Sequence, residues 1–212
     1  MINQEDQENI LRLISNTIKQ DLTCYAFGGN AMMFYGYKDE TKDVDILFER
    51  EEEREEFIRA LKFLGYDEIS PIKIYLPEKL KDKHKPLMFK RDDERFDLFF
   101  GKIFHTVLSP KMKEDLFAVH EFKGKYSLTV KVLRKEHLVL LKAVTEREND
   151  FRDIRTIVET DKQFDWQYFI DEVLWQSEHG NSWALLDVKR MMTELKEFTF
   201  IPTKIFDKFY KK

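Results

Sequence analysis

Three aspartates stand within apolar runs of the kind that form β-strands. Asp43 and Asp45 belong to residues 43–48 (Asp-Val-Asp-Ile-Leu-Phe), and Asp97 belongs to residues 95–100 (Arg-Phe-Asp-Leu-Phe-Phe). Aspartate is disfavoured in strand interiors, so its presence there calls for a function. Residues i and i+2 of a strand share one face about 6.6 Å apart, at roughly 3.3 Å per residue, which lets two carboxylates converge on one or two divalent cations.

These carboxylates predict a magnesium or manganese site. Mg²⁺ is typically held by one or two carboxylates together with the phosphates of a substrate, so such a site needs few protein ligands. Asp43 and Asp45 supply two of them, and Asp97 completes the cluster if its strand lies beside theirs. We therefore interpret Asp43, Asp45 and Asp97 as ligands of Mg²⁺ or Mn²⁺ that carries nucleotide phosphates.

A glycine pair upstream of the aspartates predicts a phosphate-binding turn. Gly28 and Gly29 follow the apolar run 22–27 and precede a predicted helix over residues 30–35. Glycine permits positive φ and lets the backbone approach a ligand closely. The start of a helix offers free N–H groups to an anion, and Asn30 is a residue type that caps helices. We expect Gly28, Gly29 and Asn30 to bind nucleotide.

The order of these motifs resembles the nucleotidyltransferase superfamily, which has the polymerase-β-like fold. There, Gly-Gly or Gly-Ser precedes a hydrophobic-flanked Asp-x-Asp, and a third acid follows on a later strand; here thirteen residues separate Gly29 from Asp43. The nearer likeness is to AbiEii-type and related small nucleotidyltransferases. It rests on residues 28–31 (Gly-Gly-Asn-Ala), 41–45 (Thr-Lys-Asp-Val-Asp), 138–142 (Leu-Val-Leu-Leu-Lys) and 150–154 (Asp-Phe-Arg-Asp-Ile), and the likeness covers residues 22–158.

The resemblance implies an enzyme that moves a nucleoside monophosphate group from an NTP to a hydroxyl acceptor. It implies that Asp43 and Asp45 hold the metals, and that Asp97 binds one metal and helps to deprotonate the acceptor. Lys142 would reach the triphosphate, or would instead be a solvent-facing helix lysine. Thr41 would brace the turn before the aspartate-bearing strand. The acceptor stays open among RNA, protein and a small molecule.

Two other classes of function remain open. The chain could be a nucleotide-binding module that keeps the fold without turnover. It could also be a partner-binding protein, such as one half of a toxin–antitoxin pair that contacts a small protein through its helical end. Retention of all three aspartates favours the enzyme, because a binding relic has no chemical need for the full set.

Composition restricts the class of protein. The 212-residue chain has a formal net charge of -4, is 42% apolar and contains 19 phenylalanines, which predicts a folded protein without an overall attraction to nucleic acid. Its single cysteine, Cys24, excludes an internal disulfide. The five histidines show no zinc spacing. A polar, acidic N-terminus and the lack of long apolar stretches predict a cytoplasmic protein without a signal peptide or a membrane partner.

Hydrophobic periodicity predicts the elements that must position the aspartates. The fold class is α+β: a nucleotidyltransferase-like mixed sheet flanked by helices over residues 1–133, followed by a helical part over 134–212. The predicted strands are 22–27, 44–48, 72–76, 86–90, 95–100 and a hairpin of 118–122 with 126–133. The predicted helices comprise an opening helix through residues 10–18, one through 57–64 that ends at Gly65, and four marked by 138–144, 151–158, 166–174 and 185–195.

Overall fold

The chain is divided into two compact units. The computed structural model describes residues 1–74, 77–145, 149–161 and 163–210. The first unit comprises Met1–Phe104 and Leu116–Leu133, and the second comprises His105–Asp115 and Arg134–Lys212. Residues 105–115, which the sequence interpretation placed with the first part, group with the helical unit. Within the described ranges, no helix is long and apolar enough to cross a membrane.

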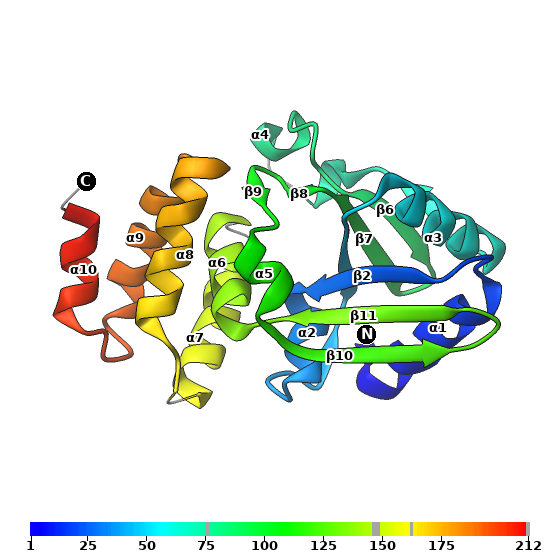
Figure 1. Ribbon diagram of the computed structural model, residues 1–212, viewed down its shortest axis with the longest axis horizontal. Coiled ribbons are helices and arrows are strands. Elements are labelled where there is room, and N and C mark those ends of the chain that lie inside the picture. Colours follow the sequence, from blue (N-terminus) through cyan, green and yellow to red (C-terminus); the bar gives the residue numbers. More distant parts are fainter. Residues whose placement is uncertain (75–76, 146–148, 162, 211–212) are drawn as a thin grey trace. The chain divides into compact units, whose positions relative to one another are not determined.

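The first unit is built on a mixed sheet (Figure 1). Seven strands of the described part follow in the order β10-β11-β2-β4-β7-β6-β5, so the predicted α+β fold with a mixed sheet is confirmed. β4 runs parallel to β7 and antiparallel to β2, while β11 runs parallel to β2. Their bounds are β2 Leu22–Phe27, β4 Asp43–Phe48, β5 Asp67–Ile69, β6 Leu87–Arg91, β7 Glu94–Phe100, β10 Leu116–Lys123 and β11 Ser127–Leu133.

Two helices cover one face of this sheet. They are α1 (Gln4–Thr17), which contacts β10 and β11, and α3 (Glu51–Phe63), which contacts β2, β4 and β7. The Phe57 ring of α3 packs against Phe48 and Phe96 with centroids 5.3 and 5.8 Å away. Because strand residues alternate faces, packing of Phe48 and Phe96 against α3 turns Asp43, Asp45 and Asp97 to the opposite face.

One predicted strand is wrong. Where residues 72–76 were expected to be extended, a 3-10 helix spans Pro71–Lys73, with the Ser70 hydroxyl accepting from the Ile72 N–H. Proline sets its own φ and is suited to the first turn of a helix, which explains the difference. Residues 75 and 76 lie outside the described residues. Short elements that the periodicity did not predict are β1 Ile2–Asn3, β3 Glu40–Thr41, β5 Asp67–Ile69, α4 Pro77–Leu80, β8 Lys102–Ile103, β9 Thr106–Val107, α5 Pro110–Glu114 and α10 Thr203–Tyr210.

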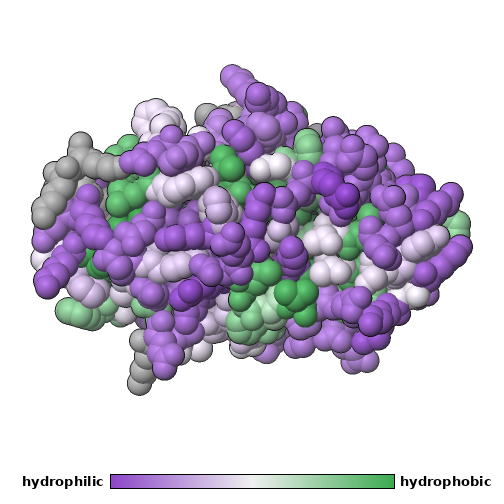
Figure 2. All heavy atoms as spheres, viewed as in Figure 1, coloured by the Kyte–Doolittle hydropathy of each residue, from purple (hydrophilic) through white to green (hydrophobic). Residues whose placement is uncertain are grey.

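The second unit is helical and is arranged around α6 (Lys135–Thr145). Every residue of 136–145 is buried, and α7 (Asp150–Thr160), α8 (Trp166–His179) and α9 (Ala184–Leu195) pack around this helix. A helix that is covered all round serves as a core element. The four predicted C-terminal helices are therefore present. On the face that Figure 2 shows, hydrophilic residues cover most of the surface and apolar ones form small patches.

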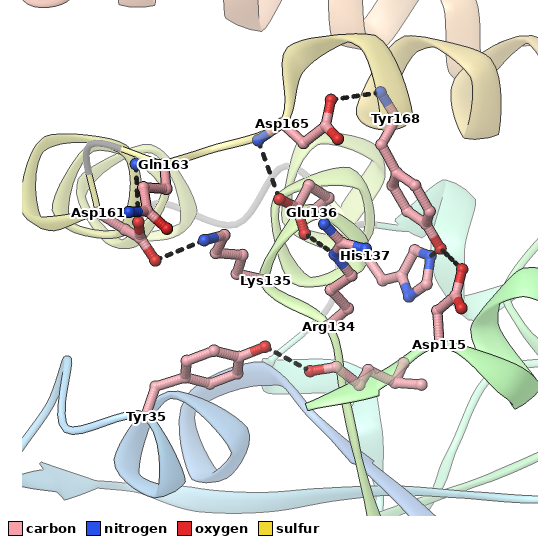
Figure 3. A network of polar contacts seen from close by, with 11 residues as sticks. Tyr35, Asp115, Arg134, Lys135, Glu136, His137, Asp161, Gln163, Asp165 and Tyr168 are labelled. Atoms are coloured by element: carbon pink, nitrogen blue, oxygen red, sulfur yellow. Dashed lines mark hydrogen bonds and ion pairs between the residues drawn. The ribbon is translucent and has the colours of Figure 1, made fainter. Parts of the chain in front are cut away.

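A polar network lies at the start of α6 (Figure 3). The Tyr168 hydroxyl donates to Asp115 Oδ2 at 2.8 Å, and His137 Nε2 lies 3.0 Å from the Tyr168 hydroxyl oxygen. Because a carboxylate only accepts, the Tyr168 proton points to Asp115 and His137 donates. Arg134 and Lys111 lie over the Tyr168 ring, 4.3 and 4.9 Å from its centroid. Burial, and then the charge of Arg134, lower the pKa of His137 to about 3.

This shift predicts a loss of stability in mild acid. The His137 pKa is about 3 when folded and about 6.5 when unfolded. Below pH 6.5 the unfolded chain therefore binds a proton that the folded chain does not. Between pH 7 and pH 5 this costs about 2 kcal/mol of the free energy of unfolding. Urea unfolding at both pH values should show a smaller difference for His137→Gln than for the parent. Equal pH dependence in the parent and in His137→Gln would contradict the assignment.

Candidate active site

The pairing of β4 with β7 brings the three predicted aspartates together. In this parallel pair, Asp43 is the register partner of Arg95, and Asp45 is the partner of Asp97. One carboxylate oxygen from each aspartate lies within 4.8 Å of the others. Asp45 and Asp97 are buried, and Asp43 is partly exposed. The prediction that Asp97 lies on a strand beside Asp43 and Asp45 is confirmed.

The glycine pair lies directly against this cluster. α2 (Gly28–Phe34) begins where β2 ends, and β2 pairs Phe27 with Asp45. Gly28 has φ +68, and a Cβ there would overlap Asp45 Oδ2 and lie 2.8 Å from its Cγ. A Cβ on Gly29 would overlap Oγ1 of Thr41. Only glycine lets the backbone turn this close to the aspartate-bearing strand.

Asn30 and Thr41 hold the strand that carries Asp43 and Asp45. The buried Asn30 accepts the Asp45 N–H at its Oδ1, 3.0 Å away. The expectation that Asn30 caps the helix is wrong, because α2 begins at Gly28 with Phe27 at the cap position. The Thr41 hydroxyl donates to Asp43 Oδ1 at 3.4 Å, so it braces the turn as predicted.

Arg95 belongs to the cluster, although the sequence interpretation assigned it no role. Its Nε donates to Asp97 Oδ1 at 2.8 Å, and its Nη2 lies 3.3 Å from Asp97 Oδ2 and also contacts Asp43 Oδ2. Burial lowers the pKa of Arg95, but the charges of Asp97 and Asp43 outweigh it, so that the pKa lies above its usual value. Strand alternation was the available signal, because Arg95 and Asp97 are two residues apart.

These residues fit a divalent cation. The cluster brings three carboxylates together, and the Arg95 guanidinium contacts two of them. Carboxylate oxygens are the donors that Mg²⁺ and Mn²⁺ favour. The Arg95 guanidinium already places a cationic group among these oxygens. The donor set therefore suits an ion held by Asp43, Asp45 and Asp97.

Lys142 lies in the second unit and is buried. Its Nζ is 2.6 Å from Asp153 Oδ2 and 3.3 Å from Asp150 Oδ1, and Thr145 Oγ1 donates to Asp150 Oδ2 at 2.7 Å. Only 4% of the Lys142 side chain is exposed, so the alternative of a solvent-facing lysine is wrong. Its role at a triphosphate stays a prediction, and that role would compete with the two carboxylates for the ammonium group.

Removal of the Lys142 charge is expected to destabilise the helical unit. Lys142→Met should lower the free energy of unfolding by about 3 kcal/mol, because Asp150 and Asp153 would stay buried without this cation. The matched control is Lys208→Met, since Lys208 pairs with Asp171 at 3.2 Å in a more exposed position. An exposed pair contributes about 0–1 kcal/mol. Urea unfolding measures both values. A loss as small as that of Lys208→Met would contradict a structural role for Lys142.

The chain matches no known family model and no curated protein. Solved structures do match it, among them a crystal structure of ANT(2")-Ia, an aminoglycoside nucleotidyltransferase, in complex with adenylyl-2"-tobramycin. That structure aligns with a TM-score of 0.50 and 12% sequence identity, over 81% of this chain and 97% of its own. At this identity the likeness shows the fold: the chain has a nucleotidyltransferase-like fold.

Proposed function

We propose that this protein is a metal-dependent nucleotidyltransferase that moves a nucleoside monophosphate group from an NTP to a hydroxyl acceptor. One observation carries the proposal: Asp43, Asp45 and Asp97 converge on one sheet face beside the Gly28 turn. The same motifs in the same order occur in the superfamily whose fold the chain has. Fold alone does not specify activity, so the weight rests on the carboxylate cluster.

The residues have distinct roles in this proposal. Asp43, Asp45 and Asp97 hold Mg²⁺ or Mn²⁺, which supplies positive charge to the phosphates where charge develops during transfer. Gly28 and Gly29 present backbone N–H groups to the phosphates, and Asn30 fixes Asp45 through its backbone. The acceptor oxygen forms a bond to the α-phosphorus, the bond to the pyrophosphate oxygen breaks, and Asp97 takes the hydroxyl proton.

The acceptor is the part of the reaction that the site leaves open. The ANT(2")-Ia structure contains an adenylylated small molecule, which makes a small-molecule hydroxyl the first class to test. The AbiEii-type motifs instead favour RNA or protein, together with a toxin–antitoxin role and a small protein partner. A net charge of -4 gives no general attraction to RNA.

One observation favours the non-catalytic alternative. Arg95 engages both oxygens of Asp97, as it would in a nucleotide-binding module that keeps the fold without turnover. This alternative predicts nucleotide binding without transfer, so the same experiment separates the two functions.

The test is transfer of α-labelled NTPs, each with Mg²⁺, to total RNA, cell protein and polyhydroxylated small molecules. Parent and Asp43→Asn/Asp45→Asn proteins are run side by side. Label that appears only with the parent would establish nucleotidyl transfer and name the base and the acceptor class. Metal-dependent nucleotide binding without transfer would support the binding module. The absence of both nucleotide binding and transfer would overturn the proposal.

A further inference from the structure

Arg95 lies inside the carboxylate cluster rather than at its rim. The register of β4 and β7 places Asp43 beside Arg95 and Asp45 beside Asp97, so four charged side chains lie together on one sheet face. Only 16% of the Arg95 side chain is exposed. Adjacent strands are about 4.8 Å apart, and alternate residues of one strand are about 6.6 Å apart, so each of these side chains is within reach of its neighbours.

The guanidinium holds Asp97 in a two-pronged contact. Nε and Nη2 of Arg95 donate to Oδ1 and Oδ2 of Asp97, at 2.8 and 3.3 Å, and Nη2 also contacts Asp43. Such paired contacts are directional and stronger than hydrogen bonds between neutral groups. An ion that takes an oxygen from Asp97 or Asp43 must therefore share that oxygen with Arg95 or displace it.

The charge of Arg95 acts in opposite directions on the two states of the cluster. Without an ion, three carboxylates repel one another, and the guanidinium offsets part of that repulsion. With an ion, the guanidinium is a like charge at short range and a competitor for the same oxygens. Arg95 should therefore stabilise the metal-free fold and weaken the binding of the metal.

We propose that Arg95 is a resident counter-cation: it keeps Asp43 and Asp97 assembled in the metal-free protein and yields their oxygens when a divalent ion binds. This inference rests on the proposed function, because it takes the three aspartates as the metal ligands. Arg95 then has a positioning role, exerted through Asp43 and Asp97. Its contacts with them set the metal concentration at which the ion binds to the cluster.

The test compares Arg95→Gln and Arg95→Lys with a matched control, Arg91→Gln. Arg91 is the last residue of β6, the strand that pairs with β7, but it contacts Glu94 at 2.8 Å and donates to the Leu64 carbonyl instead of an aspartate of the cluster. Thermal unfolding is measured in EDTA, and Mn²⁺ binding is measured by the electron paramagnetic resonance signal of the free ion. Both readouts are independent of activity.

Arg95→Gln is expected to melt at a lower temperature than the parent in EDTA, yet to bind Mn²⁺ about tenfold more tightly, which corresponds to about 1.4 kcal/mol. Arg95→Lys keeps the positive charge but loses the two-pronged contact with Asp97, so its Mn²⁺ Kd should fall between those of the parent and Arg95→Gln. Arg91→Gln should lower the melting temperature and leave the Kd unchanged, as any purely structural arginine would.

An Mn²⁺ Kd that is unchanged or higher in Arg95→Gln would overturn the inference while leaving the metal site in place. If Arg95→Gln does not fold, a Kd of Arg95→Lys equal to or above that of the parent overturns it in the same way. A parent that binds no Mn²⁺ would overturn the metal assignment of the proposed function itself, and with it this inference. Mn²⁺ binding by the parent therefore distinguishes failure of the metal assignment from failure of the inference about Arg95.

Discussion

Asp45→Asn is expected to lower nucleotidyl transfer about 10³- to 10⁴-fold, or about 4 to 5 kcal/mol of transition-state stabilisation. Asp45 is 1% exposed and lies between the Gly28 turn and Asp97. Asparagine has nearly the same shape but no charge, so the backbone bond from the Asp45 position to Asn30 can persist while the site loses an anionic ligand. The measurement is kcat/KM with the acceptor that the labelling experiment identifies.

Binding gives a second readout for the same variant. A ligand at a concentration of 100 times its Kd raises the free energy of unfolding by about 2.7 kcal/mol. Asp45→Asn should lose most of the increment in this free energy that Mn²⁺ and NTP give to the parent. The matched control is Asp67→Asn, an exposed aspartate on β5 of the same sheet. It should keep both the transfer and the increment. An Asp45→Asn protein that responds to Mn²⁺ and NTP as the parent does would contradict the site assignment.

The local part of this site was predictable from sequence. A two-residue spacing in a strand is enough to place Asp43 and Asp45 on one face, because side chains alternate along every strand. The glycine pair was likewise recognisable as a turn. What sequence could not supply was the register between β4 and β7, which places Asp45 opposite Asp97. That register depends on how both strands bury their apolar face against α3, and a shift by one residue would turn each side chain to the other face.

The residues that were missed or misread make tertiary contacts. Asn30 is a residue type that often caps helices, yet its side chain accepts a hydrogen bond from the backbone N–H of Asp45, fifteen residues later. In the sequence, Arg95 is an ordinary charged residue near the start of a strand. Only the pairing of β4 with β7 shows that Asp43 lies beside it. A charged helix residue such as Lys142 is expected in solvent, and only its contacts with Asp150 and Asp153 explain its burial.

The helical unit shows the same division between local and distant information. Apolar period alone located α6 to α9, because each helix must bury a stripe of its surface. The same period carried no signal that residues 105–115 group with these helices. That segment reaches α8 through Gln176, whose side chain bonds both the N–H and the carbonyl of Val107, at 3.0 and 2.7 Å. Hydrogen bonds over 69 residues of sequence leave no periodic pattern.

Gly28→Ala is expected to lower the free energy of unfolding by about 4 kcal/mol, from two separate costs. A left-handed backbone costs a residue with a Cβ about 1–2 kcal/mol. Insertion of a methyl group into a packed site adds about 1–3 kcal/mol. Here the methyl group would overlap Asp45 Oδ2, with φ at +68. The carboxylate must move to make room, so Mn²⁺ binding should be lost together with stability.

Gly36→Ala separates the two costs, because it has the cost of the left-handed backbone without that of the inserted methyl group. Gly36 has φ +74, and a Cβ there would meet nothing within 4 Å, so the substitution should cost only the backbone strain. Urea unfolding of both variants then gives the contact with Asp45 as a difference, expected to be about 2–3 kcal/mol. Mn²⁺ binding should survive in Gly36→Ala. Equal losses in the two variants would mean that Asp45 does not lie against the turn, and the glycine pair would then have no part in positioning the cluster.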